Sequence, residues 1–455
     1  MNETIYTITN PQKFMTESYL RGKLIKYGFP EEVVSINIIK KEQMAIEIEL
    51  HFKIPEIANK FFNNYKSKSF GLGKNYKLNI IEGKGTKTDE IPNTNEIIFN
   101  DTYESWIDIY YMRKNYEEGL ILVNPLQKEL QKKMINSLIQ NIKSTYIKGH
   151  NIINYLFPIT THDKRTLLQV LAYEFKETPF ILNKIGFLKE PVEKLRFMTS
   201  FFISQIYLSP LRIKPINPLL GETYQVKIGN LNCYFEQTST DPPTTNIYCY
   251  DSDKLYKIYG YISIYTRTGI NNCKVFKLGN LYIEYYDGQT YKIYYPSYYI
   301  GGITLGKTSF NVRNCSLVID ITNRLISFID FGDKNKGNMK YPDEFKGKLV
   351  SMNEVSIDAK SAKHTIVEED SISLDEFDGE WTKELRFGGK KYWERNKNNL
   401  CKLYEPEYKL KSDSSLREDL QFYNQNDTEK AQTIFNELYT KQSNDFKLRQ
   451  KYKKG

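Results

Sequence analysis

The stretch Lys214-Pro-Ile-Asn-Pro-Leu-Leu-Gly-Glu-Thr-Tyr224 divides a helical part of the chain from a part rich in strands. Two stretches before it, Lys164 to Phe175 and Pro191 to Ser204, have helical patterns. After it, from Tyr224 to about Phe331, short aromatic and β-branched runs are separated by Gly, Asn and Asp turns. Regularly spaced strands without intervening helices predict an antiparallel meander that curls into a barrel or a sandwich.

The same stretch resembles the signature Lys-Pro-Phe-Asn-Pro-Leu-Leu-Gly-Glu-Thr of the oxysterol-binding protein family, and only Ile216 differs over its ten positions. A second segment, Glu236-Gln-Thr-Ser-Thr-Asp-Pro-Pro243, is similar to the family fingerprint Glu-Gln-Val-Ser-His-His-Pro-Pro and agrees with it at five of eight positions. Weaker matches occur at Gly149 to Pro158, Gly379 to Trp381, Tyr392-Trp393 and Asp413 to Asp419. The resemblance covers residues 125 to 455.

The resemblance implies an α+β fold, with a large incomplete antiparallel β-barrel around a lipid tunnel, flanking helices and an amphipathic lid. Our candidate for the lid is the helix that the pattern predicts over Leu126 to Tyr146. This basic amphipathic helix either covers the tunnel, contacts a membrane or packs on a core, and the sequence leaves these alternatives open. Its apolar stripe includes Leu130, Met134, Leu138 and Ile142.

The resemblance also implies which residues contact the lipid, because the signature and the fingerprint lie at the tunnel in this family. The candidate lipid-binding residues are Lys214, Pro215, Asn217, Leu219, Glu236, Gln237, Ser239, Thr240 and Asp241.

The chain departs from the family where relatives hold the head group of phosphatidylinositol 4-phosphate. Those relatives use the signature Lys and Asn, the two fingerprint His, and a Lys, Glu and Arg series on the C-terminal helix. Lys214 and Asn217 are retained. The other positions are occupied by Thr240 and Asp241 in the fingerprint and by Phe435, Tyr439 and Ser443 near the C-terminus.

These replacements suggest that the phosphoinositide site is lost or rebuilt while the apolar tunnel survives, since a carboxylate repels a phosphate. Alternatively, Asp241 pairs with Lys214, which would leave a neutral polar entrance that suits a sterol hydroxyl or a zwitterionic head group.

Composition limits the class of protein. The 455 residues carry a net charge of +9, which favours an anionic membrane surface or nucleic acid without establishing either. Five widely spaced Cys indicate neither a disulfide framework nor a zinc site. The N-terminus lacks a signal sequence, and no apolar run approaches the roughly 18 residues of a membrane span. We therefore expect a cytoplasmic protein with peripheral membrane association, and no metal, cofactor or enzymatic activity.

Residues 1 to 82 predict a ferredoxin-like βαββαβ domain. The expected strands are Thr4 to Asn10, Val33 to Ile39, Met44 to Phe52 and Tyr76 to Ile81, and the expected helices are Gln12 to Tyr27 and Ile54 to Lys66. RNA-recognition domains share this order, but Glu47 and Glu49 place negative charge where RNA would lie. A protein partner or a structural role is the better expectation. A polar segment, residues 83 to 124, then connects to the domain at 125 to 455.

Taken together, these patterns predict lipid binding and transfer between membranes, with a sterol or a glycerophospholipid as cargo. The alternative is a lipid-responsive sensor or scaffold that does not transfer lipid.

Overall fold

The computed structural model describes residues 4–9, 20–21, 24, 34–41, 44–52, 79–82, 111–114, 119–141, 152–209, 214–332, 339–351, 355–358, 363–366 and 373–452. The chain divides into two compact units, residues 1–94 and 95–455.

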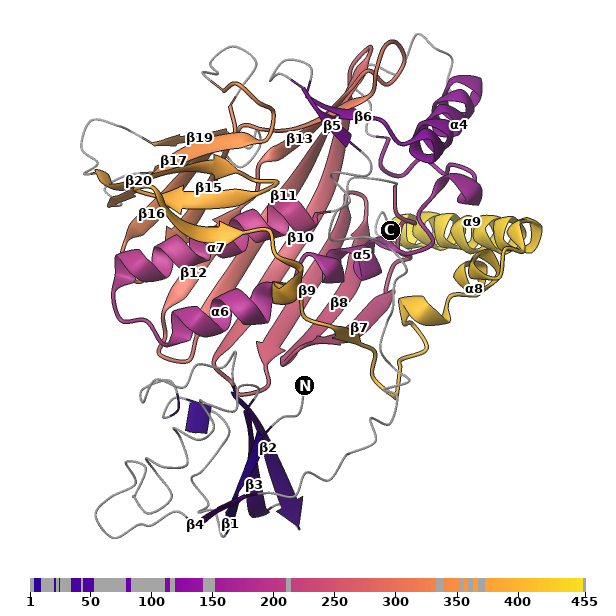
Figure 1. Ribbon diagram of the computed structural model, residues 1–455. Coiled ribbons are helices and arrows are strands. Elements are labelled where there is room, and N and C mark those ends of the chain that lie inside the picture. The colour runs from indigo at the N-terminus through magenta and orange to yellow at the C-terminus, as the bar shows by residue number, and fades with distance from the viewer. Residues whose placement is uncertain are drawn as a thin grey trace. The chain divides into compact units, whose positions relative to one another are not determined.

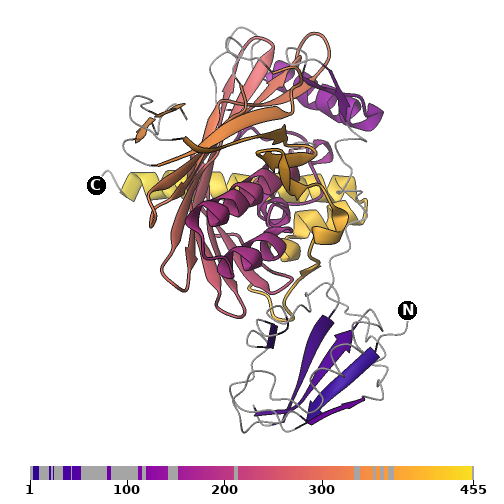
Figure 2. The same cartoon turned by 60° about the vertical axis from the view of Figure 1, so that its left-hand side comes forward.

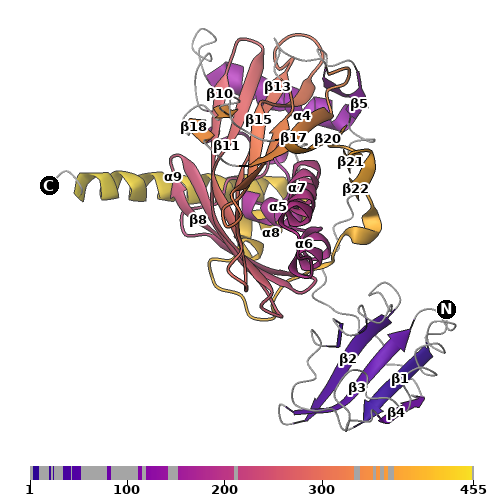
Figure 3. The same ribbon diagram turned by 90° about the vertical axis from the view of Figure 1, so that its left-hand side faces the viewer.

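The first unit contains a four-stranded antiparallel sheet of β1 (Thr4–Thr9), β2 (Val34–Lys41), β3 (Met44–Phe52) and β4 (Asn79–Glu82). The strand order is β2-β3-β1-β4, which is the order of a ferredoxin-like sheet (Figure 3). Within the predicted first helix, residues 20, 21 and 24 are helical. The predicted second helix, Ile54 to Lys66, lies outside the described residues.

The second unit contains the predicted barrel and its helices (Figure 1). The helices are α4 (Pro125–Asn141), α5 (Leu167–Tyr173), α6 (Thr178–Gly186), α7 (Pro191–Leu208), α8 (Glu418–Asn424) and α9 (Thr428–Tyr452). The strands are β5 (Tyr111–Arg113), β6 (Leu120–Leu122), β7 (Thr223–Ile228), β8 (Leu231–Thr240), β9 (Pro243–Asp251), β10 (Tyr256–Thr268), β11 (Asn272–Tyr285), β12 (Thr290–Tyr294), β13 (Ser297–Gly301), β14 (Ser309–Arg313), β15 (Cys315–Asp320), β16 (Leu325–Asp330), β17 (Glu344–Ser351), β18 (Val355–Asp358), β19 (Lys363–Ile366), β20 (Ser373–Glu380), β21 (Glu384–Phe387), β22 (Lys390–Glu394) and β23 (Leu403–Tyr404).

Strands β7 to β11 form an antiparallel meander that branches at β11. One end of β11 pairs with β12, which continues through β15, β16, β17, β20 and β21 to β22. The other end pairs with β13, which continues through β14 and β6 to β5. Among the described residues, no ladder joins β22 to β23, the strand that pairs with β7. The barrel is therefore incomplete, as the family resemblance implied.

The sheet curves around α5, α6 and α7 (Figure 2). Helix α7 is apolar on most of its circumference and has 13 buried residues, which is the pattern of a helix inside a core. Two glycines help the long strands β10 and β11 to approach each other. A Cβ atom at Gly260 would lie 1.9 Å from the carbonyl oxygen of Asn280, and one at Gly279 would lie 2.1 Å from that of Tyr261.

Several predicted boundaries were wrong. The helix predicted from Lys164 begins only at Leu167, because Thr166 and Gln169 form a capping box. The sequence pattern predicts two short strands, Lys274 to Phe276 and Leu281 to Tyr286, but the structure has one continuous strand there, β11. Helix α6 was not predicted, and the strands continue well beyond Phe331, to β23. Two short strands, β5 and β6, lie within the predicted connecting segment and extend the sheet.

Candidate functional site

The signature segment packs against the start of α5. Ile216 is fully buried, its N–H donates to the Arg165 carbonyl oxygen at 3.0 Å, and its own carbonyl oxygen accepts from Leu167 N at 3.0 Å. These bonds hold the segment between the helices and the sheet. From there the chain enters β7 at Thr223.

Glu222 anchors the end of the signature segment to the C-terminal part of the chain. Arg417 Nη1 lies 2.9 Å from Glu222 Oε2, and Arg417 Nη2 lies 2.5 Å from Asp419 Oδ2. Ser414 Oγ donates to the other Glu222 oxygen at 2.6 Å. All four residues are buried. The weakly matching stretch Asp413 to Asp419 therefore has a structural role, because it neutralises Glu222.

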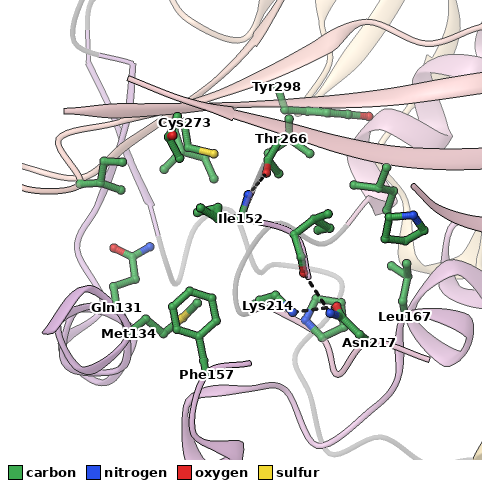
Figure 4. A pocket seen from close by; sticks show the side chains of 18 of the residues that line it. Gln131, Met134, Ile152, Phe157, Leu167, Lys214, Asn217, Thr266, Cys273 and Tyr298 are labelled. Atoms are coloured by element: carbon green, nitrogen blue, oxygen red, sulfur yellow. Dashed lines mark hydrogen bonds between the residues drawn. The ribbon is translucent and has the colours of Figure 1, made fainter. Parts of the chain in front are cut away.

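An apolar cavity of about 290 Å³ lies between the sheet, α5, the signature segment and α4 (Figure 4). This volume is close to the lower end of the roughly 300–1,000 Å³ that ligand pockets span. Thr266 and Cys273 line it from the sheet, while Phe157, Lys214 and Asn217 face them from the other side. Of the predicted signature residues, Lys214, Pro215 and Asn217 line this cavity. Leu219 does not line it and packs instead beside Ile216 in a separate apolar cluster.

Helix α4, the predicted lid, lies along one wall of the apolar cavity. Leu130 and Met134 line the cavity together with Gln127, Gln131 and Ile135. The side chain of Leu138 and the whole of Ile142 lie outside the described residues. Lys128, Lys132 and Lys133 are exposed on the same helix, so that its apolar stripe and its basic face point in different directions.

Lys214 is the charged group of the signature in this cavity. Its Nζ donates to Asn217 Oδ1 at 2.8 Å, and Asn217 Nδ2 donates to the Ile153 carbonyl oxygen at 2.9 Å (Figure 4). Among the described residues Lys214 has no ion pair with Asp241, so the predicted pairing is wrong. Burial lowers the pKa of Lys214 from 10.5 to about 7. His162 is buried nearby, and burial and the charge of Lys214 lower its pKa.

We expect Lys214→Met to raise the free energy of unfolding most at acidic pH. Below about pH 7 the folded protein has to bury a charged Lys214, whereas between about pH 7 and pH 10 the folded form is neutral and the unfolded form still protonated. Wild-type stability should therefore rise with pH across this window. Urea unfolding near pH 6 and pH 9 should show the difference between mutant and wild type shrinking as pH rises. The exposed Lys132→Met is the control, and a pH-independent difference would contradict the assignment.

The fingerprint residues divide between the two faces of β8. Gln237 is buried, and its side chain bonds to the Ser239 carbonyl oxygen at 2.7 Å and to Thr245 Oγ1 at 2.8 Å. Glu236, the preceding residue, is exposed on the other face. Successive side chains of a strand point to opposite faces, so Glu236 points away from the face of β8 that carries Gln237.

A second cavity, of about 310 Å³, adjoins the first at Asn217, Pro218 and Pro243, which line both. Gln237, Thr240 and Asp241 also line it, whereas Ser239 lies beside it and accepts a bond from Asp241 N at 3.3 Å. Asn154 Nδ2 donates to the Thr240 carbonyl oxygen at 2.8 Å. Ser443 and Tyr439 complete the wall from α9.

The replaced positions of the C-terminal helix mostly face a core. Phe435 and Tyr439 are buried with Ile216, Leu420 and Ala431. The ring centroids of Phe435 and Tyr439 are 4.6 Å apart. Phe435 and Tyr439 thus stabilise the packing of α9 on the signature segment. Of the three replaced positions on α9, Ser443 is the one that lines the second cavity without belonging to this apolar cluster.

The sequence analysis missed a buried ion pair in the wall of the apolar cavity. Lys277 Nζ contacts the Glu174 carboxylate, and both residues line the cavity. Lys277 follows Cys273 and Val275 at alternate positions of β11, so its inward direction could have been inferred. Its partner could not, because Glu174 is 103 residues away in the chain.

No described helix is both long enough and apolar enough to cross a membrane. Within the described ranges, no three His, Cys, Asp or Glu side chains are grouped so that they could hold a metal ion.

The amino-acid sequence is similar to those of known proteins. Oxysterol-binding protein 9 of Dictyostelium discoideum is 25% identical over 323 residues, which cover 69% of this chain and 75% of that protein. Oxysterol-binding protein-related protein 4C of Arabidopsis thaliana is 28% identical over 141 residues, covering 29% of this chain and 37% of the relative.

Solved structures share the fold. The Osh1 ORD domain in complex with ergosterol matches with a TM-score of 0.56 at 17% identity, over 73% of this chain and 90% of that one. The Osh3 ORD of Saccharomyces cerevisiae in complex with PI(4)P matches with a TM-score of 0.54 at 18% identity, over 69% of this chain and 84% of that one. The family model of oxysterol-binding protein matches residues 138–454. The chain belongs to the oxysterol-binding protein family.

Proposed function

We propose that the protein binds a sterol or a glycerophospholipid in the apolar cavity and transfers it between membranes, without covalent catalysis. The observation that carries this proposal is a largely apolar cavity with α4 along one wall. Removing about 400 Å² of apolar lipid surface from water contributes roughly 10 kcal/mol at about 25 cal/mol/Å², before the cost of ordering the complex. Burial of the apolar surface is thus the main favourable contribution to lipid binding in this cavity.

The ligands of related structures support this proposal. Osh1 ORD structures contain ergosterol or cholesterol, and the Osh3 ORD structure contains PI(4)P. We propose the same broad class, a membrane lipid, for this chain.

Two loops beside the apolar cavity support peripheral contact with an anionic membrane. Ile270 and Leu305 are each 75% exposed, and Ile270 also lines the cavity. Asn271 ties the two loops together, since its side chain donates to the Leu305 carbonyl oxygen and accepts from Leu305 N. Exposed Arg267 and Lys274 lie opposite each other on β10 and β11. Apolar tips beside basic residues favour an anionic bilayer, and we propose a cytoplasmic protein that docks on membranes through this face.

The second candidate function is a lipid sensor or scaffold that does not transfer lipid. Its support is the presence of a separate unit at residues 1–94 that contains a ferredoxin-like sheet. We propose residues 1–82 as this partner domain, 83–124 as the connection and 125–455 as the lipid-binding domain. A transfer assay separates the two functions, because a carrier accelerates exchange between liposomes while a sensor needs only to bind.

The lid assignment gives a direct test of the transfer function. Met134→Asp would place a charge in the cavity wall, and we expect it to reduce lipid transfer between donor and acceptor liposomes about tenfold or more. The matched control is Asn136→Asp, which adds the same charge at an exposed position of α4. We expect the control to transfer lipid at the wild-type rate. Equal transfer by Met134→Asp and Asn136→Asp would argue against this cavity as the lipid site.

A further inference from the structure

Lys214 brings a primary amine into the wall of the apolar cavity. It lines this space together with the apolar side chains of Phe157 and Leu167 (Figure 4). The backbone at this position is fixed, because the Lys214 carbonyl oxygen accepts from Asp163 N at 2.9 Å. The amine is therefore held on an ordered segment and next to a space that suits an alkyl chain.

The hydrogen bond of the Lys214 amine is to a neutral amide. Its Nζ donates to Asn217 Oδ1 at 2.8 Å. Asn217 is itself held in place, since its Nδ2 donates to the Ile153 carbonyl oxygen at 2.9 Å. A neutral amide stabilises an ammonium ion less than a carboxylate does, so burial favours the uncharged form of this amine.

The carboxylates around Lys214 are paired with other cations. These carboxylates belong to the neighbouring residue Asp163, to the signature segment with its anchor, and to the cavity wall. The pairs are Asp163 with Arg165, Glu222 and Asp419 with Arg417, and Glu174 with Lys277. Within the described part of the chain, no carboxylate forms an ion pair with Lys214. His162 adds no negative charge either, and burial lowers its pKa so that it is neutral near pH 7.

An uncharged lysine is a nucleophile. Burial lowers the pKa of Lys214 to about 7, whereas the pKa of an exposed lysine is about 10.4. At about pH 7.5, more than half of the Lys214 side chains are therefore neutral, compared with about one in a thousand exposed lysines. Lysines that are desolvated in an apolar pocket react with carbonyl compounds to form Schiff bases.

We propose that the Lys214 amine holds a long-chain aldehyde as a reversible imine, with the alkyl chain in the apolar cavity. The nitrogen lone pair forms a bond to the aldehyde carbon, and the two amine hydrogens leave with the carbonyl oxygen as one water molecule. Hydrolysis reverses this step and returns the aldehyde unchanged, so the step is covalent binding rather than catalysis. The second cavity adjoins at Asn217, and its polar side chains suit the released water.

The imine proposal rests on the proposed lipid-binding function and adds an aldehyde lipid to the cargo. Hexadecanal tests it together with sodium cyanoborohydride, which reduces an imine to a secondary amine that does not hydrolyse. The full-length protein would be incubated near pH 7.5 with phosphatidylcholine liposomes that contain hexadecanal, then reduced, digested and mapped by mass spectrometry. We expect one alkyl chain per protein, on Lys214, and at least tenfold less label on exposed Lys132.

Two controls show whether the label depends on the cavity. Hexadecanol has the same chain without the aldehyde, so adding it first should reduce labelling of Lys214 at least threefold. This control uses the wild-type protein and does not depend on the folding of a variant. Lys214→Met should lose the single alkyl chain, and Lys132→Met should keep it.

Extraction of cholesterol and phosphatidylcholine by the wild-type protein, measured without aldehyde, separates the imine proposal from the proposed function. If either lipid is extracted but the label is spread evenly over exposed lysines, the imine site is wrong and the lipid-binding function stands. The same conclusion follows if hexadecanol gives no protection or if Lys214→Met keeps its alkyl chain. If neither lipid is extracted, the proposed function itself fails.

Discussion

Replacing Arg417 by methionine is expected to lower the free energy of unfolding by about 3–5 kcal/mol, because two buried carboxylates would lose their common partner. The side chains of Arg417, Glu222 and Asp419 are 5%, 3% and 0% exposed. Arg417 also donates to the Asn217 carbonyl oxygen at 3.1 Å. The substitution should therefore loosen the signature segment as well as the domain, and lipid transfer should fall even where the protein remains folded.

Urea unfolding followed by circular dichroism checks this prediction. Arg386→Met is the matched control, since Arg386 Nη2 pairs with Glu384 at 2.5 Å but its side chain is 48% exposed. Exposed pairs contribute about 0–1 kcal/mol. Arg417→Lys should give an intermediate result because lysine keeps the charge and loses the planar fork. If Arg417→Met is no less stable than Arg386→Met, Glu222 is not held in the way described above.

The second large expected effect concerns binding of the phosphatidylinositol 4-phosphate head group. We propose that the wild-type protein binds phosphatidylinositol 4-phosphate poorly and that Thr240→His, Asp241→His increases its extraction from liposomes. A carboxylate 4 Å from a unit negative charge repels it by about 4 kcal/mol at an effective dielectric near 20. Asp241 is exposed, so screening reduces this effect. We expect a gain of about tenfold to a hundredfold rather than the full thousandfold.

The control for this gain is Glu236→His, which exchanges a carboxylate for a histidine on the exposed face of β8. It should leave extraction of phosphatidylinositol 4-phosphate unchanged. Wild-type protein that extracts this lipid as well as the double variant does would contradict the proposed loss of the site. Phe435 and Tyr439 limit the expected gain, since they pack in a core and restore no cation.

Local sequence patterns predicted the antiparallel meander, and the family resemblance implied the incomplete barrel with its tunnel. The signature placed Lys214, Pro215 and Asn217, and the helical stripe placed Leu130 and Met134. The alternation of side chains along a strand also predicts that Gln237 and Glu236 face opposite sides of β8. The prediction nevertheless assigned both of these fingerprint residues to the lipid-binding site. The error was to give a motif a single role where successive residues of a strand face opposite directions.

Long-range partners could not be predicted. Glu222 lies within the signature segment, and only its contact with Arg417 shows that it is a structural anchor. The ion pair of Lys277 and Glu174 likewise joins two elements that no local pattern connects. A single sequence contains the propensity of each segment but not the pairing of charges between segments, which depends on how the sheet curves around the helices.

The anchor of the signature segment also orders events during synthesis. Glu222 and Arg417 are separated by 195 residues, and a ribosome adds roughly 5–20 residues per second, so Glu222 waits about 10–40 s for its partner. Until then, the Glu222 carboxylate of the signature segment lacks the Arg417 guanidinium that neutralises it in the folded protein. Most strands of the barrel are synthesised before this contact can form, so the signature segment gains its anchor only after those strands. The signature segment can therefore reach its final, anchored state only after the strands of the sheet are already part of the nascent chain.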